Sequence, residues 1–166
     1  MIKESELEFK HNSSESKNLA NVTLLGICFT IFTFIISIRP ELLIRDYVLT
    51  LQLVCSIPLF MSTIFARIKA GHLKKAKYVG AYGSTTFLLG YTFLVNVVGL
   101  LTSNFISLKI SMIFFIVNIL AALSYTIVQI GDHKNTWKRR IIKDGAFIIL
   151  IILLGILPAL GYISFS

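Results

Sequence analysis

The chain has 166 residues, of which 55% are hydrophobic and 14% are charged, and its net charge is +8. A soluble domain carries about 25% charged residues, so this chain has too little polar surface to cover a water-soluble core. Its mean hydropathy of +0.81 is typical of a surface that faces lipid. The basic excess does not require nucleic acid as a partner, because Lys and Arg gather in the cytoplasmic loops of membrane proteins.

The first segment, residues 1–18, is polar and mixed in charge. Its bias toward Ser, Glu, Lys and Asn predicts a flexible cytoplasmic tail. The segment does not show the basic region and short apolar core of a cleavable signal, and a full-length apolar run follows it. We therefore expect this run to stay in place as a membrane anchor.

Five apolar segments follow in chain order, and their predicted bounds are 19–38, 47–66, 79–101, 108–130 and 146–164. Each is long enough for a membrane-spanning helix, which needs about 20 residues to cross ~30 Å of hydrocarbon. The segments are continuously apolar, whereas barrel strands are about 10 residues long and alternate. The sequence therefore predicts an all-α fold: an integral membrane helical bundle with five transmembrane helices, which residues 19–166 form as one domain.

The connections between the predicted helices differ in length and charge. Segment 39–46 contains Pro40, and both it and segment 102–107 are predicted to be tight turns. Segments 67–78 and 131–145 are longer and rich in basic residues. Prolines also lie inside two predicted spans, Pro58 and Pro158, where we expect them to bend the helices.

Basic residues are divided unequally between the two ends of the predicted bundle. Three lie in the tail, five in 67–78 and five in 131–145, against three at the other end, Arg39, Arg45 and Lys109. Because the side richer in Lys and Arg stays cytoplasmic, we expect the N-terminus inside and the C-terminus outside. The expected location is a prokaryotic inner membrane, with the chain as a multi-pass protein.

The sequence gives no catalytic, cofactor or metal site. The interiors of the predicted spans hold no charged residue, and charges at that depth usually mark function. No phosphate-binding loop, dinucleotide fingerprint or zinc spacing is present. The three histidines lie in the tail and in the basic segments, where a solvated role is expected. We therefore expect neither an enzyme nor a cofactor.

Uncharged polar residues recur at helical spacing in the third and fourth predicted spans, with a further pair in the second. The candidate interior residues are Gln52, Thr85, Thr92, Asn96, Ser111, Asn118, Tyr125 and Gln129. Because a short turn joins the third and fourth spans, their polar faces should meet each other or a common interior. Two interpretations stay open: hydrogen bonds between helices, or the lining of a path for a small solute.

The basic segments also have two interpretations. They can contact anionic lipids of the inner leaflet, where each basic charge is worth up to ~1 kcal/mol, or they can bind an acidic cytoplasmic protein. The candidate contact residues are Lys74, Lys75, Lys77, Trp137, Lys138, Arg139 and Arg140. No aromatic platform accompanies the lysines, so we do not expect nucleic acid as a partner.

Three functional hypotheses follow from these patterns. The first is a non-enzymatic, self-associating membrane protein that acts as the anchor or sensor for a soluble cytoplasmic partner, as in prokaryotic defence or immunity modules. The second is an oligomeric channel or small-solute transporter lined by the two polar stripes. The third, an intramembrane enzyme, is disfavoured because no acid, His or Lys lies within a predicted span interior.

Overall fold

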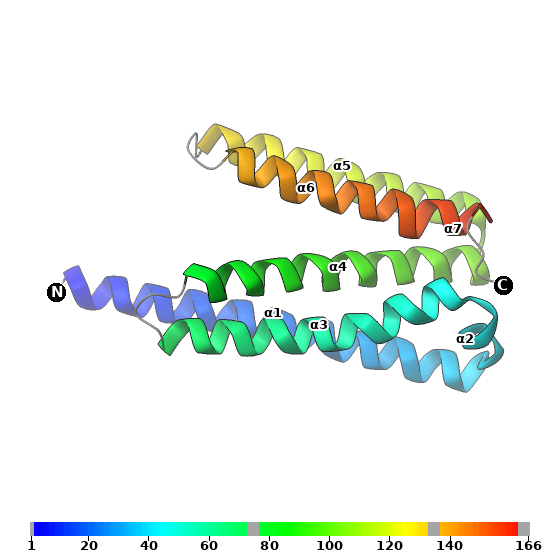
Figure 1. Ribbon diagram of the computed structural model, residues 1–166, viewed down its shortest axis with the longest axis horizontal. Helices are drawn as coiled ribbons and strands as arrows, with labels where there is room; N and C mark the ends of the chain where they lie inside the picture. Colours follow the sequence, from blue (N-terminus) through cyan, green and yellow to red (C-terminus); the bar gives the residue numbers. More distant parts are fainter. Residues whose placement is uncertain (1, 73–76, 133–136, 163–166) are drawn as a thin grey trace.

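The computed structural model describes residues 2–72, 77–132 and 137–162, and these residues are almost entirely helical, with no strand among them (Figure 1). The helices are α1 (Ile2–Ile38), α2 (Glu41–Arg45), α3 (Tyr47–His72), α4 (Lys77–Phe105), α5 (Leu108–Asp132) and α6 (Trp137–Ile151). A π-helical segment, η2 (Ile152–Ile156), then leads into a last short turn, α7 (Leu157–Ala159). The predicted all-α fold is confirmed for the residues described.

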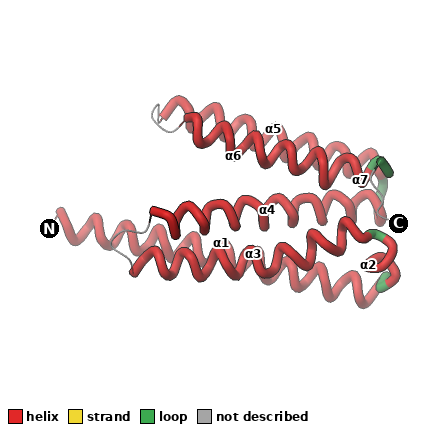
Figure 2. Tube along the Cα trace, viewed as in Figure 1, coloured by secondary structure: helices red, strands yellow, loops and turns green. Residues whose placement is uncertain are grey.

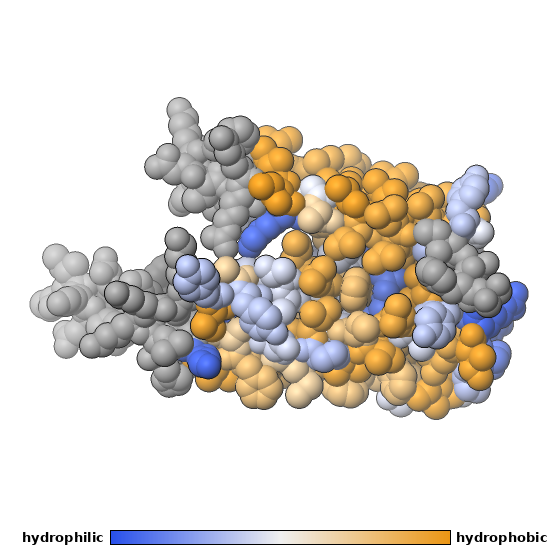
Figure 3. All heavy atoms as spheres, in the orientation of Figure 1, coloured by the Kyte–Doolittle hydropathy of each residue, from blue (hydrophilic) through white to orange (hydrophobic). Residues whose placement is uncertain are grey.

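Five helical stretches are long and apolar enough to cross a membrane, and the fifth runs through α6, η2 and α7. The stretches are Asn18–Ile38, Tyr47–Lys69, Tyr78–Phe105, Leu108–Val128 and Ile141–Ala159. Many large apolar side chains are exposed along them, and Figure 3 shows apolar residues covering α5 and α6 on the face in view. Helices satisfy their own backbone polar groups, as a bilayer requires. The chain thus has the architecture of a multi-pass membrane protein, and its orientation stays a prediction.

The first helix is longer than the sequence predicts. α1 begins at Ile2, so the segment predicted to be a flexible tail is helical from that residue onward. No Gly or Pro precedes Gly26 to interrupt the helix, and Glu, Lys and Leu are good helix formers. The apolar part of the helix removes the cost of nucleation, which allows the polar part to continue it.

The two short connections lie at one end of the bundle, which we call the capped end. Asp46 begins α3 as its N-cap, because its Oδ1 accepts a hydrogen bond from the N–H of Leu49 at 3.0 Å. Ser107 does the same for α5, where its Oγ accepts the N–H of Ile110 at 3.3 Å. Segment 39–46, predicted as a turn, contains the short helix α2. The other end, which holds 67–78 and 131–145, is called the basic end.

α4 is the central helix of the bundle. It packs against α3 on one side and against α5, α6 and η2 on the other, while α1 packs on α3. Figures 1 and 2 show α5 and α6 as a separate pair, which approaches α4 at the capped end and diverges from it toward the basic end. Where the pair diverges, Figure 3 shows the surface hollowed.

Aromatic side chains connect the two sides of α4. Phe87 stacks on Tyr91 with their ring centroids 6.0 Å apart, and Tyr91 stacks on Phe147 of α6 at 6.0 Å. On the opposite side, Phe87 meets the buried ring of Phe60 from α3 edge-on at 6.4 Å. These contacts join the two buried apolar clusters of the bundle, one around α3 and one around α6.

α3 continues through Pro58 as a single helix, and its axis is bent in Figure 2. Both cysteines are free, and Cys28 of α1 accepts a hydrogen bond from the Ser56 hydroxyl at 3.2 Å. This contact fixes the register of α1 against α3.

Candidate functional site: a buried amide pair and a groove at the basic end

Two of the predicted interior residues form a buried amide pair. Gln52 of α3 and Asn96 of α4 are 2% and 0% exposed, and Asn96 Nδ2 donates a hydrogen bond to Gln52 Oε1 at 2.8 Å. An unpaired amide in hydrocarbon costs several kcal/mol. The hydrogen bond between Gln52 and Asn96 offsets part of this cost for both side chains. The pair lies within the candidate spans of both helices.

The amide pair also binds the irregular part of the last span. Gln52 Nε2 donates to the carbonyl oxygen of Leu154 at 2.8 Å, and Asn96 Nδ2 makes a longer contact of 3.4 Å with that of Leu150. Pro158 lies four residues after Leu154 and has no N–H, so this carbonyl lacks its α-helical donor. Gln52 supplies the missing donor across the bundle.

Glycines make room for close packing beside the amide pair. A side chain at Gly99 of α4 or at Gly155 of η2 would overlap the ring of Phe115, and one at Gly155 would also collide with Asn96 Oδ1. The hydroxyl of Ser111 donates to the carbonyl of Gly99 at 2.8 Å. Small residues thus allow α4, α5 and η2 to approach closely, as is usual between membrane helices.

The rest of the α4 stripe is not gathered into one site. Thr92 is buried, and its hydroxyl donates to the carbonyl of Leu88 in its own helix at 2.7 Å. Thr85 is exposed and donates to the carbonyl of Ala81 at 3.1 Å. Among the side chains of this stripe, Asn96 is thus the one that makes hydrogen bonds to other helices.

The α5 stripe does not face α4 along its whole length. Ser111 faces α4, but Asn118 is half-buried and its Nδ2 donates to the carbonyl of Phe114 in its own helix at 2.9 Å. Tyr125 is 62% exposed. The two predicted stripes meet near the capped end and separate beyond it, because α5 diverges from α4. The side chain of Gln129 lies outside the described residues.

A second buried polar cluster was missed in the sequence. The hydroxyls of Thr63 and Thr86 hydrogen-bond at 2.8 Å between α3 and α4. Asn21 of α1 is fully buried, and neither polar atom of its side chain has a hydrogen-bond partner. The register set by Cys28 and Ser56 places Asn21 level with Thr63. The sequence did contain a signal for this cluster, because Asn21 is a polar residue inside the first apolar run.

A carboxylate lies at the start of the last span. Thr126 of α5 donates a hydrogen bond of 2.5 Å to Asp144 Oδ2 of α6. The sequence placed Asp144 in the basic segment 131–145, whereas the candidate span that contains it begins at Ile141. The bond joins α5 to α6 near the basic end.

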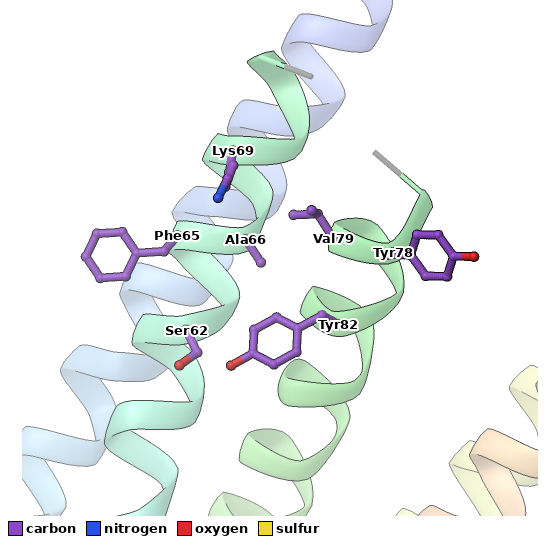
Figure 4. A pocket seen from close by; sticks show the side chains of 7 residues that line it. All are labelled: Ser62, Phe65, Ala66, Lys69, Tyr78, Val79 and Tyr82. Carbon is purple, nitrogen blue, oxygen red and sulfur yellow. The ribbon is translucent and has the colours of Figure 1, made fainter. Parts of the chain in front are cut away.

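A groove runs between α3 and α4 at the basic end, with a cavity volume of about 460 Å³. Its lining residues are Ser62, Phe65, Ala66, Lys69, Tyr78, Val79 and Tyr82. Figure 4 shows the hydroxyl end of Tyr82 directed from α4 toward Ser62 of α3. Next to the groove, the Arg67 guanidinium lies 5.1 Å from the centroid of the Phe87 ring, as a cation–π pair.

The predicted basic contact residues fall mostly outside this description. Lys74 and Lys75 are outside the described residues, and so are the side chains of Lys77, Trp137, Lys138, Arg139 and Arg140. Within the described ranges, no three His, Cys, Asp or Glu residues group in a way that would hold a metal ion.

No protein-family model, curated protein or solved structure matches this chain. Its function is therefore inferred from its own residues and their contacts.

Proposed function

We propose that this chain is a non-enzymatic membrane protein of the prokaryotic inner membrane that self-associates and serves as the anchor or sensor for a soluble partner. Its basic end would face the cytoplasm and bind an acidic surface of that partner. The N-in orientation in this proposal follows from the distribution of Lys and Arg.

The observation that carries this proposal is the continuation of the helices into the basic segments. α3 extends to His72 and α4 starts at Lys77, while α5 extends to Asp132 and α6 starts at Trp137. Among the basic residues of these two segments, those within 67–72, 77–78 and 137–145 thus lie on helical backbone. A charge pattern held on ordered backbone costs less entropy on binding than one on a free loop.

The charge of segment 67–78 favours an acidic partner. The segment holds five basic residues and no acidic one, and the sequence contains no Asp or Glu between Asp46 and Asp132. Complementary charges raise the association rate and select the partner, and salt screens them beyond about 8–10 Å. We therefore expect binding to weaken as salt is raised.

The outer face of α5 favours self-association. Asn118 is half-buried, so part of its amide would meet lipid in a single copy. A second copy would cover it and supply a further hydrogen bond. The same face could instead line a path between copies, and this observation supports an oligomeric channel or transporter as the second candidate function.

The test of the partner proposal uses the full chain purified from native membranes in a mild detergent. We expect a soluble protein to co-purify at a fixed ratio, to dissociate at high salt, and to be lost from the combined variant Lys74→Gln, Lys75→Gln, Lys77→Gln. Arg67 and Lys69 remain in that variant to hold the orientation. The matched control is Lys109→Gln, an exposed lysine at the capped end. The proposal would be refuted if the mass of the purified chain in light scattering included no partner protein. It would also be refuted if the triple variant still bound the partner.

A further inference from the structure

The groove between α3 and α4 lies at the boundary between the apolar and polar parts of the helices. Lys69 ends the candidate span of α3 and Tyr78 begins that of α4, whereas Ser62 lies about two turns deeper. At such boundaries Lys and Tyr place their polar tips among lipid headgroups and their apolar parts in the acyl region. The mouth of the groove is therefore at headgroup depth and its inner part at acyl depth.

The floor of the groove is closed by the contact between the two helices. Ala66 and Gly83 are buried there, and a Cβ added to Gly83 would lie 3.1 Å from the Cβ of Ala66. A ligand cannot pass between the helices at this level, so it must lie along their outer surface. Phe65 and Tyr82 are 65% and 56% exposed and form the walls, which leaves the groove open to the bilayer.

The lining combines one cation with hydroxyl groups and an otherwise apolar surface. Figure 4 shows the hydroxyl end of Tyr82 directed toward Ser62, and Lys69 farther along α3 toward the basic end. Neither α3 nor α4 contains an acidic residue, so no carboxylate of these helices competes for the ammonium group of Lys69. Such a lining suits an amphiphile that has an anionic head.

We infer that this groove binds one anionic phospholipid of the leaflet at the basic end. The ammonium group of Lys69 would face the lipid phosphate, and the hydroxyls of Ser62 and Tyr82 would donate to ester or phosphate oxygens. An acyl chain would lie against Phe65 and Val79. The volume of about 460 Å³ lies within the ~300–1,000 Å³ of small-molecule sites. The inference holds for either orientation of the chain and does not rest on the soluble partner.

The test measures lipid retention by the full chain in nanodiscs that contain phosphatidylcholine with a minority of phosphatidylglycerol. We expect native mass spectrometry to show one phosphatidylglycerol retained in preference to phosphatidylcholine. Lys69→Gln should weaken that preference about fivefold, which corresponds to ~1 kcal/mol for one basic residue at an anionic surface. Lys109→Gln, which removes an exposed lysine at the capped end, should leave the preference unchanged.

A second arm locates the lipid and does not depend on charge. A photoactivatable phosphatidylglycerol should form adducts on Phe65 and Tyr82, and Ser62→Trp, which fills the groove, should remove them while circular dichroism stays unchanged. Adducts spread evenly over the lipid-facing helices would overturn the inference. So would equal retention by Lys69→Gln and Lys109→Gln, or an absence of lipid adducts on Phe65 and Tyr82.

Discussion

Gln52 replaces, from another helix, a hydrogen bond that Pro158 removes. The proline has no N–H to give to the carbonyl of Leu154, and the amide of Gln52 lies 2.8 Å from that oxygen. π-helical segments are frequent where a helix serves a function, and here η2 ends directly before the turn that contains Pro158. The irregular helix and the polar side chain therefore depend on each other.

This dependence predicts an energetic coupling between the two residues. We expect Gln52→Leu to lower the free energy of unfolding by ~1 kcal/mol, because the Leu154 carbonyl and the Asn96 amide both lose a partner. With Pro158→Ala present, a backbone N–H can reach that carbonyl, and the cost of Gln52→Leu should fall by ~0.5 kcal/mol or more. Unfolding in mixed micelles, followed by circular dichroism, measures this double-mutant cycle.

The control for this cycle is Thr85→Val. The Thr85 hydroxyl is exposed and bonds to a carbonyl of its own helix, so its removal should change stability by less than ~0.5 kcal/mol. Identical costs of Gln52→Leu in the presence and absence of Pro158→Ala would show that the proline and the glutamine are independent.

At the scale of helices, packing around α4 depends on positions without side chains. Gly99 and Gly155 come from α4 and η2, and both are covered by the ring of Phe115 from α5. Three elements therefore meet at one aromatic ring, which is fully buried. Gly26 of α1, by contrast, has open space where a Cβ would be.

Alanine at these glycines should have opposite effects. Gly99→Ala should lower stability by ~1–3 kcal/mol, because the new methyl group overpacks the contact with Phe115. Gly26→Ala should raise it by up to ~1 kcal/mol through helix propensity alone. Thermal unfolding in the same detergent compares them. Adding Phe115→Leu should restore part of the loss from Gly99→Ala, and an absence of any restoration would place the strain elsewhere.

At the scale of the whole molecule, α5 has a mostly apolar exposed face, and Asn118 adds a half-buried amide to this helix. We predict that Asn118→Leu weakens self-association about fivefold, since a hydrogen bond between membrane helices is worth ~1 kcal/mol. Light scattering in detergent and cross-linking in liposomes measure the association. Ile116→Leu, at an exposed position on the same helix, is the matched control and should have no effect.

Solute flux in the same liposomes separates the two candidate functions. An anchor protein should give no flux with or without Asn118→Leu. If flux is seen and Asn118→Leu abolishes it, the channel becomes the better supported function. If the mass of the oligomer in light scattering is the same with and without Asn118→Leu, self-association through this face loses its support.

The helices were predictable from the sequence because each apolar run is long enough to cross a bilayer. The contacts of the candidate site were harder to predict from the sequence. Gln52 and Asn96 could be assigned to an interior, but their meeting depends on the rotation of α3 and α4 about their axes. The bond from Gln52 to Leu154 joins positions 102 residues apart. Pro158 gave one usable signal, since a proline always leaves the carbonyl four residues earlier without its helical donor.

Other parts of the site had no signal that separates them from ordinary packing. Asn118 and Asn96 both belong to stripes at helical spacing, yet Asn96 is fully buried and Asn118 is only half-buried. α5 lies close to α4 where the ring of Phe115 covers Gly99, and it diverges from α4 toward the basic end. The groove at the basic end likewise arises from the relative position of two helices, which periodicity does not give.

The amide pair also predicts an order in which the helices assemble. The chain is made from its N-terminus, so Gln52 and Asn96 enter the bilayer well before Leu154 leaves the ribosome. During that interval their mutual hydrogen bond of 2.8 Å is the bond of the cluster that can already form, and it holds α3 against α4. The last span is inserted afterwards, and Pro158 leaves the Leu154 carbonyl without its helical donor. We expect this carbonyl to pair with the amide of Gln52, so that the missing backbone hydrogen bond helps to position the last helix.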